Sequence, residues 1–188
     1  MGEGDEESGF IRLEFEELPE DEMLSRAHAF YEHMDKRRTT RHFSDREVPR
    51  ELIELAIRTA STAPSGAHLQ PWTFVAISNP ALKRRIRDAA EAEERTFYEE
   101  RMPEAWEEVL TPLGTDYVKD HITEAPWIVV LFRQSQRMRG EDDMSPTYYS
   151  QESCGIAAGL FIAAVHNMGL TTLTHTPSPM GFLRDILG

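Results

Sequence analysis

A short loop of small residues is the first candidate for chemistry. Residues 64–67 read Pro-Ser-Gly-Ala, between a helical apolar pattern that ends near Ala60 and the β-prone run Trp72–Ile77. Because the side chains of this segment are small, a flat ligand can approach the backbone. The segment also offers a hydroxyl and backbone N–H groups as hydrogen-bond donors. An ordinary helix-to-strand turn has the same composition, so the loop alone leaves both interpretations open.

The second candidate is the basic segment Lys36–Arg41, which holds four cations in six residues. Guanidinium groups and a threonine hydroxyl can hold a phosphate through paired hydrogen bonds. The same charges also suit the C-terminus of a preceding helix, where the helix dipole attracts cations. The segment is therefore either an anion clamp or a helix end.

The third candidate is a set of charged and aromatic residues in the middle of the chain. Glu94 and Tyr98 are four residues apart and share one face of an expected helix, and Lys119 follows on a short helical piece. A solvated helix face explains the same charges. His68 and His175 are acid–base candidates or packed residues. Histidine spacing and the single cysteine, Cys154, give no zinc pattern.

These residues must be positioned by a mixed fold. Apolar runs predict three strands, at 72–78, 127–132 and 170–176, and the spacing of apolar residues predicts helices between them. Three central strands flanked by helices indicate a three-layer α/β/α sandwich of the α+β class. The expected helices span 23–36, the region from Pro49 to about Ala60, 80–100, 104–110, 116–122, 147–168 and 182–187. Low apolar content from 91 to 121 predicts a weakly packed insertion.

Charge and composition narrow the classes of function. The chain has 188 residues and a net charge of −13, which argues against a nucleic-acid partner. Residues 1–22 hold ten of the 33 acidic residues and one arginine, so we expect a flexible acidic arm before a domain over 23–188. No apolar run is long enough for a membrane span, the first residues are unlike a signal peptide, and the lone cysteine fits a reducing compartment, so we expect a cytoplasmic protein.

Taken in order, the motifs resemble those of the nitroreductase superfamily, and within it the branch that removes halogen from halotyrosines. The likeness covers about residues 28–188. It is carried by Arg37-Arg38-Thr39-Thr40-Arg41, by Ala63-Pro-Ser-Gly-Ala-His68 with Gln70-Pro-Trp-Thr-Phe74, by Glu94-x-x-x-Tyr98, by Lys119 before Ala125-Pro126, and by Thr174-His-Thr-Pro177.

The resemblance implies an FMN cofactor at the interface of a homodimer, with electrons that come ultimately from NAD(P)H, directly or through a separate reductase. The residues that it implies for FMN binding are Arg37, Arg38, Thr39, Arg41, Pro64, Ser65, Gly66, Thr174, His175 through its backbone, and Thr176. Thr176 is the expected hydroxyl hydrogen-bond donor to the flavin N5. The resemblance also implies a further strand and a C-terminal arm after the position of Gly188.

The same resemblance implies a free amino acid as substrate. Glu94 would pair with its ammonium, Lys119 with its carboxylate, and Tyr98 would hydrogen-bond between them, while the Ala67 N–H would receive the phenolate oxygen. Segment 91–121 would close as a lid. Thr176 and Ala67 are the expected catalytic residues. The implied reaction is reductive dehalogenation of a 3-halotyrosine in single-electron steps. The alternatives are a general nitroreductase or quinone reductase, and a non-catalytic flavin- or halotyrosine-binding protein.

Overall fold

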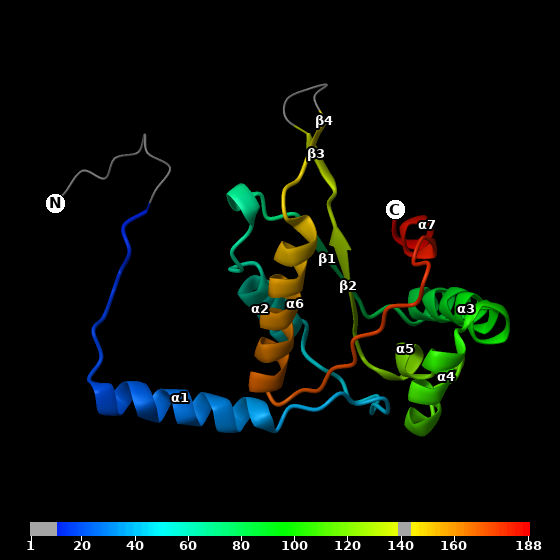
Figure 1. Ribbon diagram of the computed structural model, residues 1–188, viewed down its shortest axis with the longest axis horizontal. Helices are drawn as coiled ribbons and strands as arrows, with labels where there is room; N and C mark the ends of the chain where they lie inside the picture. Colours follow the sequence, from blue (N-terminus) through cyan, green and yellow to red (C-terminus); the bar gives the residue numbers. More distant parts are fainter. Residues whose placement is uncertain (1–10, 139–143) are drawn as a thin grey trace. The chain divides into compact units, whose positions relative to one another are not determined.

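The computed structural model describes residues 11–138 and 144–188 (Figure 1). The chain divides after Lys36 into two units, a first that ends there and a second over Arg37–Gly188. The first unit contains α1, Glu20–Asp35, which begins after Pro19 and places three acidic residues in its first turn. No residue of α1 is buried, and the helix exposes four large apolar side chains: Met23, Leu24, Phe30 and Tyr31.

A two-stranded antiparallel sheet forms the centre of the second unit. Strand β1, Trp72–Ile77, pairs with β2, Ile128–Arg133, so that Trp72 lies opposite Arg133 and Ile77 opposite Ile128. Successive side chains of a strand point to opposite faces. One apolar cluster contains Trp72, Phe74 and Leu131. The other contains Val75, Ile77 and Ile128. Both faces of the sheet are therefore covered.

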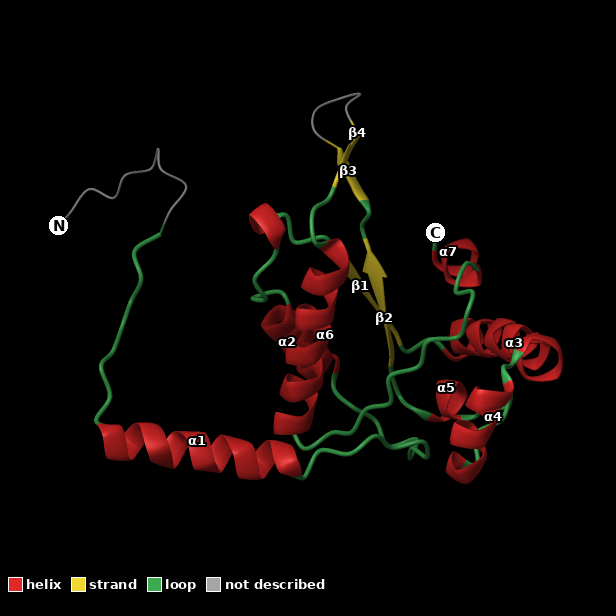
Figure 2. Ribbon diagram, in the orientation of Figure 1, coloured by secondary structure: helices red, strands yellow, loops and turns green. Residues whose placement is uncertain are grey.

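The helices form a layer on each side of this sheet (Figure 2). On one side, α6, Ser150–Asn167, packs on the sheet and against α2, Arg50–Ala60. The two helices meet through small residues such as Ala56, which is fully buried. On the other side lie α3, Pro80–Thr96, α5, His121–Glu124, and α7, Phe182–Leu187. The expected three-layer α/β/α arrangement is confirmed.

The helix α3 starts and ends for identifiable reasons. The Asn79 side chain accepts the Leu82 N–H at 3.0 Å and Pro80 occupies the first turn. After Thr96 the helix continues as a π turn, η2, Phe97–Arg101, instead of remaining α-helical to about residue 100 as expected. Short elements follow: α4, Glu104–Leu110, and η3, Thr111–Leu113. The expected helix over 116–122 is shorter and later, as α5.

The expected third strand over 170–176 is wrong. A strand needs a neighbouring backbone along its length, and within the described residues this segment finds one only at a single parallel bridge between Thr39 and Thr172, where the Thr40 N–H reaches the Thr172 carbonyl at 3.3 Å. Conversely, the loop expected over 133–146 contains a small hairpin of β3, Gln136–Met138, and β4, Met144–Pro146. Within the described ranges, no helix has the length and apolar character needed to cross a membrane.

Candidate functional site

The first part of the site is a chain of charges that joins three separate segments. Glu94 lies near the end of α3, and one of its carboxylate oxygens is 2.6 Å from the Lys119 Nζ. The other oxygen is 2.5 Å from the His175 Nε2. The side chains of Glu94 and Lys119 are only 12% and 9% exposed, so the structure brings the two predicted zwitterion-binding residues together in a largely dry place.

Tyr98 lies beside this pair, on the π turn. The Lys119 Nζ is 5.7 Å from the centre of its ring, a cation–π distance. Its hydroxyl lies 3.2 Å from the Thr115 hydroxyl. The π turn directs the ring to Lys119 and the hydroxyl to the loop after η3. Tyr98 therefore contacts the cation through its ring.

The charges around Glu94 keep it ionised. Burial by itself raises the pKa of this carboxyl, but hydrogen bonds from His175 and Lys119, together with their charges, outweigh burial, so the pKa of Glu94 lies below its ordinary value. His121 packs edge-on against the His175 ring, with 5.1 Å between the ring centres. Burial, followed by the charges of His175 and Lys119, lowers the pKa of His121 to about 4. His121 is therefore neutral at pH 7.

The second part of the site is the small-residue loop, which forms the 3-10 turn η1, Gly66–His68, beside α6. The Gly66 N–H donates to the Ser153 hydroxyl at 3.3 Å, and the Ser65 hydroxyl accepts the Gln70 N–H at 2.9 Å. A Cβ on Gly66 would lie 2.8 Å from the Tyr148 carbonyl oxygen, so only glycine fits. Ala67 and His68 have φ of 51° and 53°, in the left-handed region that side chains disfavour.

The basic segment forms the third part. The bridge from Thr39 to Thr172 ties it to the loop that carries the predicted Thr174 and Thr176. Neither Arg37 nor Arg41 has an ion pair among the described side chains, and the Thr40 hydroxyl is buried with no hydrogen-bond partner there. The guanidinium groups of Arg37 and Arg41 therefore remain available to an anion.

Side chains alternate along the loop after α6. Thr174 and Thr176 are exposed, whereas His175 between them is half-buried and points to Glu94. Two exposed hydroxyls near a guanidinium-rich segment, together with a glycine turn that a methyl group would block, suit a planar cofactor that carries a phosphate, such as FMN. The residues present therefore fit this cofactor.

The structure does not bring all the predicted residues into one place. The loop at 64–67 lies with α6 on one side of the sheet, and α3 and α5 lie on the other (Figure 1). In the second group, Glu94 belongs to α3, Tyr98 to the π turn that follows it, and Lys119 lies just before α5. The Thr174–Thr176 loop meets the second group through His175. Sequence reasoning missed the His175 side chain as a partner of Glu94, because the two are 81 positions apart and no local pattern relates them.

The chain is similar to proteins of known activity. The nitroreductase family model matches residues 34–188. The iodotyrosine deiodinase of Haliscomenobacter hydrossis is 49% identical over 95% of this chain and 80% of its own length. Human iodotyrosine deiodinase 1 is 40% identical over 99% of this chain. The chain spans 65% of the length of that protein, which is less than two thirds. A crystal structure of oxidised iodotyrosine deiodinase bound to FMN and 3-iodo-L-tyrosine superposes with a TM-score of 0.76, at 28% identity, over 84% of this chain and 80% of that one.

Proposed function

Because the chain belongs to the nitroreductase family, we propose that it is an FMN-dependent oxidoreductase that reductively dehalogenates halotyrosines. Replacing a carbon–iodine bond by carbon–hydrogen consumes two electrons and one proton and releases iodide with tyrosine. Bound FMN supplies the electrons, which originate from NAD(P)H. The relatives are named for this activity, and one of them holds both FMN and 3-iodotyrosine in its crystal structure.

The observation that carries the proposal is the buried pair of Glu94 and Lys119 at 2.6 Å. A free amino acid presents an ammonium and a carboxylate a short distance apart, and opposite charges held in a dry site complement both. A site for simple nitroaromatics or quinones has no use for such a pair. Glu94 would take the ammonium, Lys119 the carboxylate, and the Tyr98 ring would flank the cation.

The remaining roles follow the predicted assignments. Arg37, Arg38, Thr39 and Arg41 would hold the phosphate, and Pro64, Ser65 and Gly66 would line the flavin ring. Thr174, the His175 backbone and Thr176 would contact the flavin, with the Thr176 hydroxyl donating to its N5. The Ala67 N–H would orient the phenolate. Closure of segment 91–121 would exclude water from the reacting carbon.

We propose further that the active form is a homodimer. The 64–67 loop and the Glu94–Lys119 pair lie on opposite sides of the sheet, so one chain does not place its own pair over its own loop. A second copy can supply the missing half.

The decisive experiment compares ligands that differ in one charge. FMN-reconstituted protein is titrated with 3-iodotyrosine, with 3-iodotyramine, which lacks the carboxylate, and with 2-iodophenol, and quenching of flavin emission is recorded. We expect 3-iodotyrosine to bind tightest, and Lys119→Ala to remove its advantage over 3-iodotyramine while FMN affinity is unchanged. Equal loss of all three ligands and of FMN would contradict the assignment.

Turnover is tested separately. Protein reduced anaerobically and mixed with 3-iodotyrosine should yield tyrosine and iodide while the flavin is reoxidised. A flavin that stays reduced in the presence of saturating 3-iodotyrosine would identify a binding protein instead of an enzyme, and reoxidation by nitroaromatics alone would identify a general nitroreductase.

A further inference from the structure

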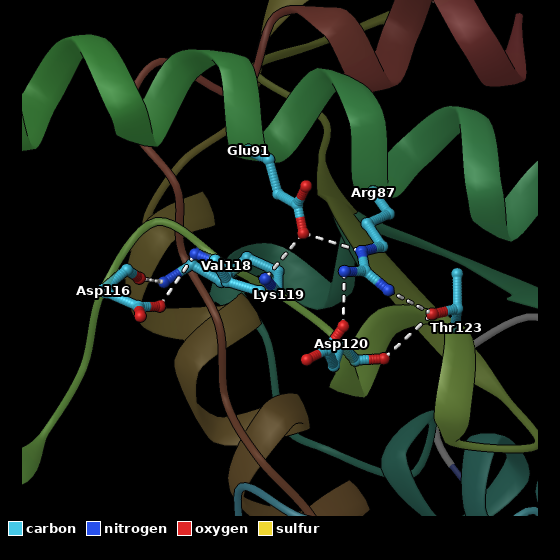
Figure 3. Close-up of polar contacts among 7 residues, drawn as sticks. All are labelled: Arg87, Glu91, Asp116, Val118, Lys119, Asp120 and Thr123. Atoms are coloured by element: carbon cyan, nitrogen blue, oxygen red, sulfur yellow. Dashed lines mark hydrogen bonds and ion pairs between the residues drawn. The ribbon is translucent and has the colours of Figure 1, made fainter.

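A second carboxylate on α3 holds Lys119 at a different point from Glu94. Glu91 lies three residues before Glu94, so both project from the same side of the helix. The Glu91 Oε1 accepts the backbone N–H of Lys119 at 2.8 Å (Figure 3). Glu94 binds the Nζ at the far end of the same residue. The helix therefore grips Lys119 by its main chain and by its side chain.

Arg87 completes this attachment. Its Nε donates to the Glu91 Oε1 at 2.7 Å, and its other nitrogens reach the Asp120 carboxylate and the Thr123 hydroxyl, the latter at 2.9 Å (Figure 3). The Thr123 hydroxyl in turn donates to the Asp120 carbonyl at 3.0 Å. Hydrogen bonding to Glu91 outweighs burial and raises the pKa of Arg87. One guanidinium thus binds the residues on both sides of His121 to α3.

This network differs from the other pairs of its kind in the molecule. Arg50 and Glu54 on α2 have the same i, i+4 spacing and a 2.6 Å contact, but their side chains are 80% and 47% exposed. Arg87 and Glu91 are 24% and 22% exposed. Both contact a segment about thirty positions further along the chain. An exposed pair on one helix contributes little, whereas this one fixes a loop.

Resting on the proposed function, we propose that Arg87 and Glu91 are positioning residues that hold Lys119 in place while its side-chain partner changes. In the ligand-free chain the Lys119 ammonium pairs with Glu94. When the ammonium of a substrate takes Glu94, the Lys119 charge must turn to the substrate carboxylate. The hydrogen bond from the Lys119 amide to Glu91 holds the Lys119 backbone in place during this exchange. The side chain can then turn to the substrate carboxylate without a shift of its Cα.

Two substitutions and a matched control test the proposal. Glu91→Ala removes the acceptor, whereas Glu91→Gln keeps an oxygen that can accept the Lys119 N–H. A hydrogen bond to a charged group accounts for about a tenfold change in affinity. We therefore expect Glu91→Ala to weaken 3-iodotyrosine binding about tenfold, with little change in the affinity for FMN or for 2-iodophenol, which carries no carboxylate. Glu91→Gln should recover most of the loss, and Glu54→Ala on α2 should behave as wild type.

The outcomes separate positioning from general damage. If Glu91→Ala matched Glu54→Ala in 3-iodotyrosine affinity, the proposal would be refuted. If it weakened FMN, 2-iodophenol and 3-iodotyrosine alike, Glu91 would be a residue of overall stability, which also overturns the proposal.

A ligand-free measurement keeps the anchor testable if the proposed function itself fails. Amide hydrogen exchange over residues 117–123 should show the Lys119 amide protected in wild type and exchanging at least about tenfold faster in Glu91→Ala. Unchanged protection would refute the anchor. Absence of 3-iodotyrosine binding in wild type, with protection lost as expected in the variant, would instead refute the proposed function and leave the anchor established.

Discussion

The buried ring of His121 makes the stability of the fold depend on pH in a specific window. The ring packs against His175, and its Nε2 is buried without a hydrogen-bond partner among the described residues. The folded-state pKa of His121 is about 4, below the ordinary value of 6.5. At pH values between these two pKa values, His121 is protonated in the unfolded chain and neutral in the folded chain. The free energy of unfolding therefore falls as the pH falls from 6.5 towards about 4.

The size of the effect follows from the shift. For a pKa of about 4 in the folded state and 6.5 in the unfolded state, lowering the pH from about 7.5 to about 5 removes about 2 kcal/mol of unfolding free energy. At a urea dependence of about 2 kcal/mol per molar, this moves the unfolding midpoint by about 1 M. The span from about pH 7.5 to about pH 5 lies above the ordinary pKa values of carboxyl groups, which are about 4.

The assay is urea unfolding of wild type and His121→Phe at both pH values. Phenylalanine keeps a flat ring against His175 and cannot bind a proton, so the variant should lose about 2 kcal/mol less than wild type on acidification. His28→Phe, at an exposed position of α1, should keep the wild-type dependence. If His121→Phe showed the same pH dependence as wild type, the attribution to this ring would be wrong.

Three further predictions concern other parts of the fold. Gly66→Ala forces a Cβ to within 2.8 Å of the Tyr148 carbonyl oxygen, so we expect a loss of about 1–3 kcal/mol in thermal unfolding and weaker FMN binding in a fluorescence titration. Lys83→Met removes the donor to the carbonyls of Thr123 and Ala125, at 3.1 and 2.7 Å, and should cost about 2 kcal/mol in urea unfolding at pH 7. The pKa of Glu94 is lowered, so its contribution to stability is present at neutral pH and is lost as pH falls through that lowered value; Glu94→Gln should be less stable than wild type at pH 7 and lose less on acidification below about 4.5.

Much of the fold could be predicted because its determinants are local. The cap at Asn79 and Pro80, the apolar run of β2 and the spacing of the last helix are each contained in a few neighbouring residues, and the helix Phe182–Leu187 has the expected bounds. The run Leu170–Thr176 failed as a strand because pairing depends on a neighbour elsewhere in the chain, and β-prone residues alone do not supply one.

The site shows the same division between local and distant determinants. The four-residue spacing of Glu94 and Tyr98 indicated a shared helix face, and the resemblance supplied Lys119 as their companion. The role of Glu91 has no local signal, because its carboxylate accepts the amide of a residue 28 positions away. The weakly packed insertion expected over 91–121 is likewise pinned at Lys119, which is 7% exposed, by contacts that no local pattern indicates.

The mutual neutralisation of Glu94 and Lys119 has a consequence for how salt acts on the protein. A zwitterion that enters this site replaces the ion pair between Glu94 and Lys119 by two ion pairs with the ligand. The net charge of the complex equals that of the free protein. Mobile ions that screen charges over about 10 Å at 0.1 M salt therefore have little to act on. The affinity for an amino acid should be nearly constant between dilute buffer and concentrated salt, whereas an amine or a carboxylic acid of the same ring, which leaves one charge of the pair without a partner, should bind in a salt-dependent way.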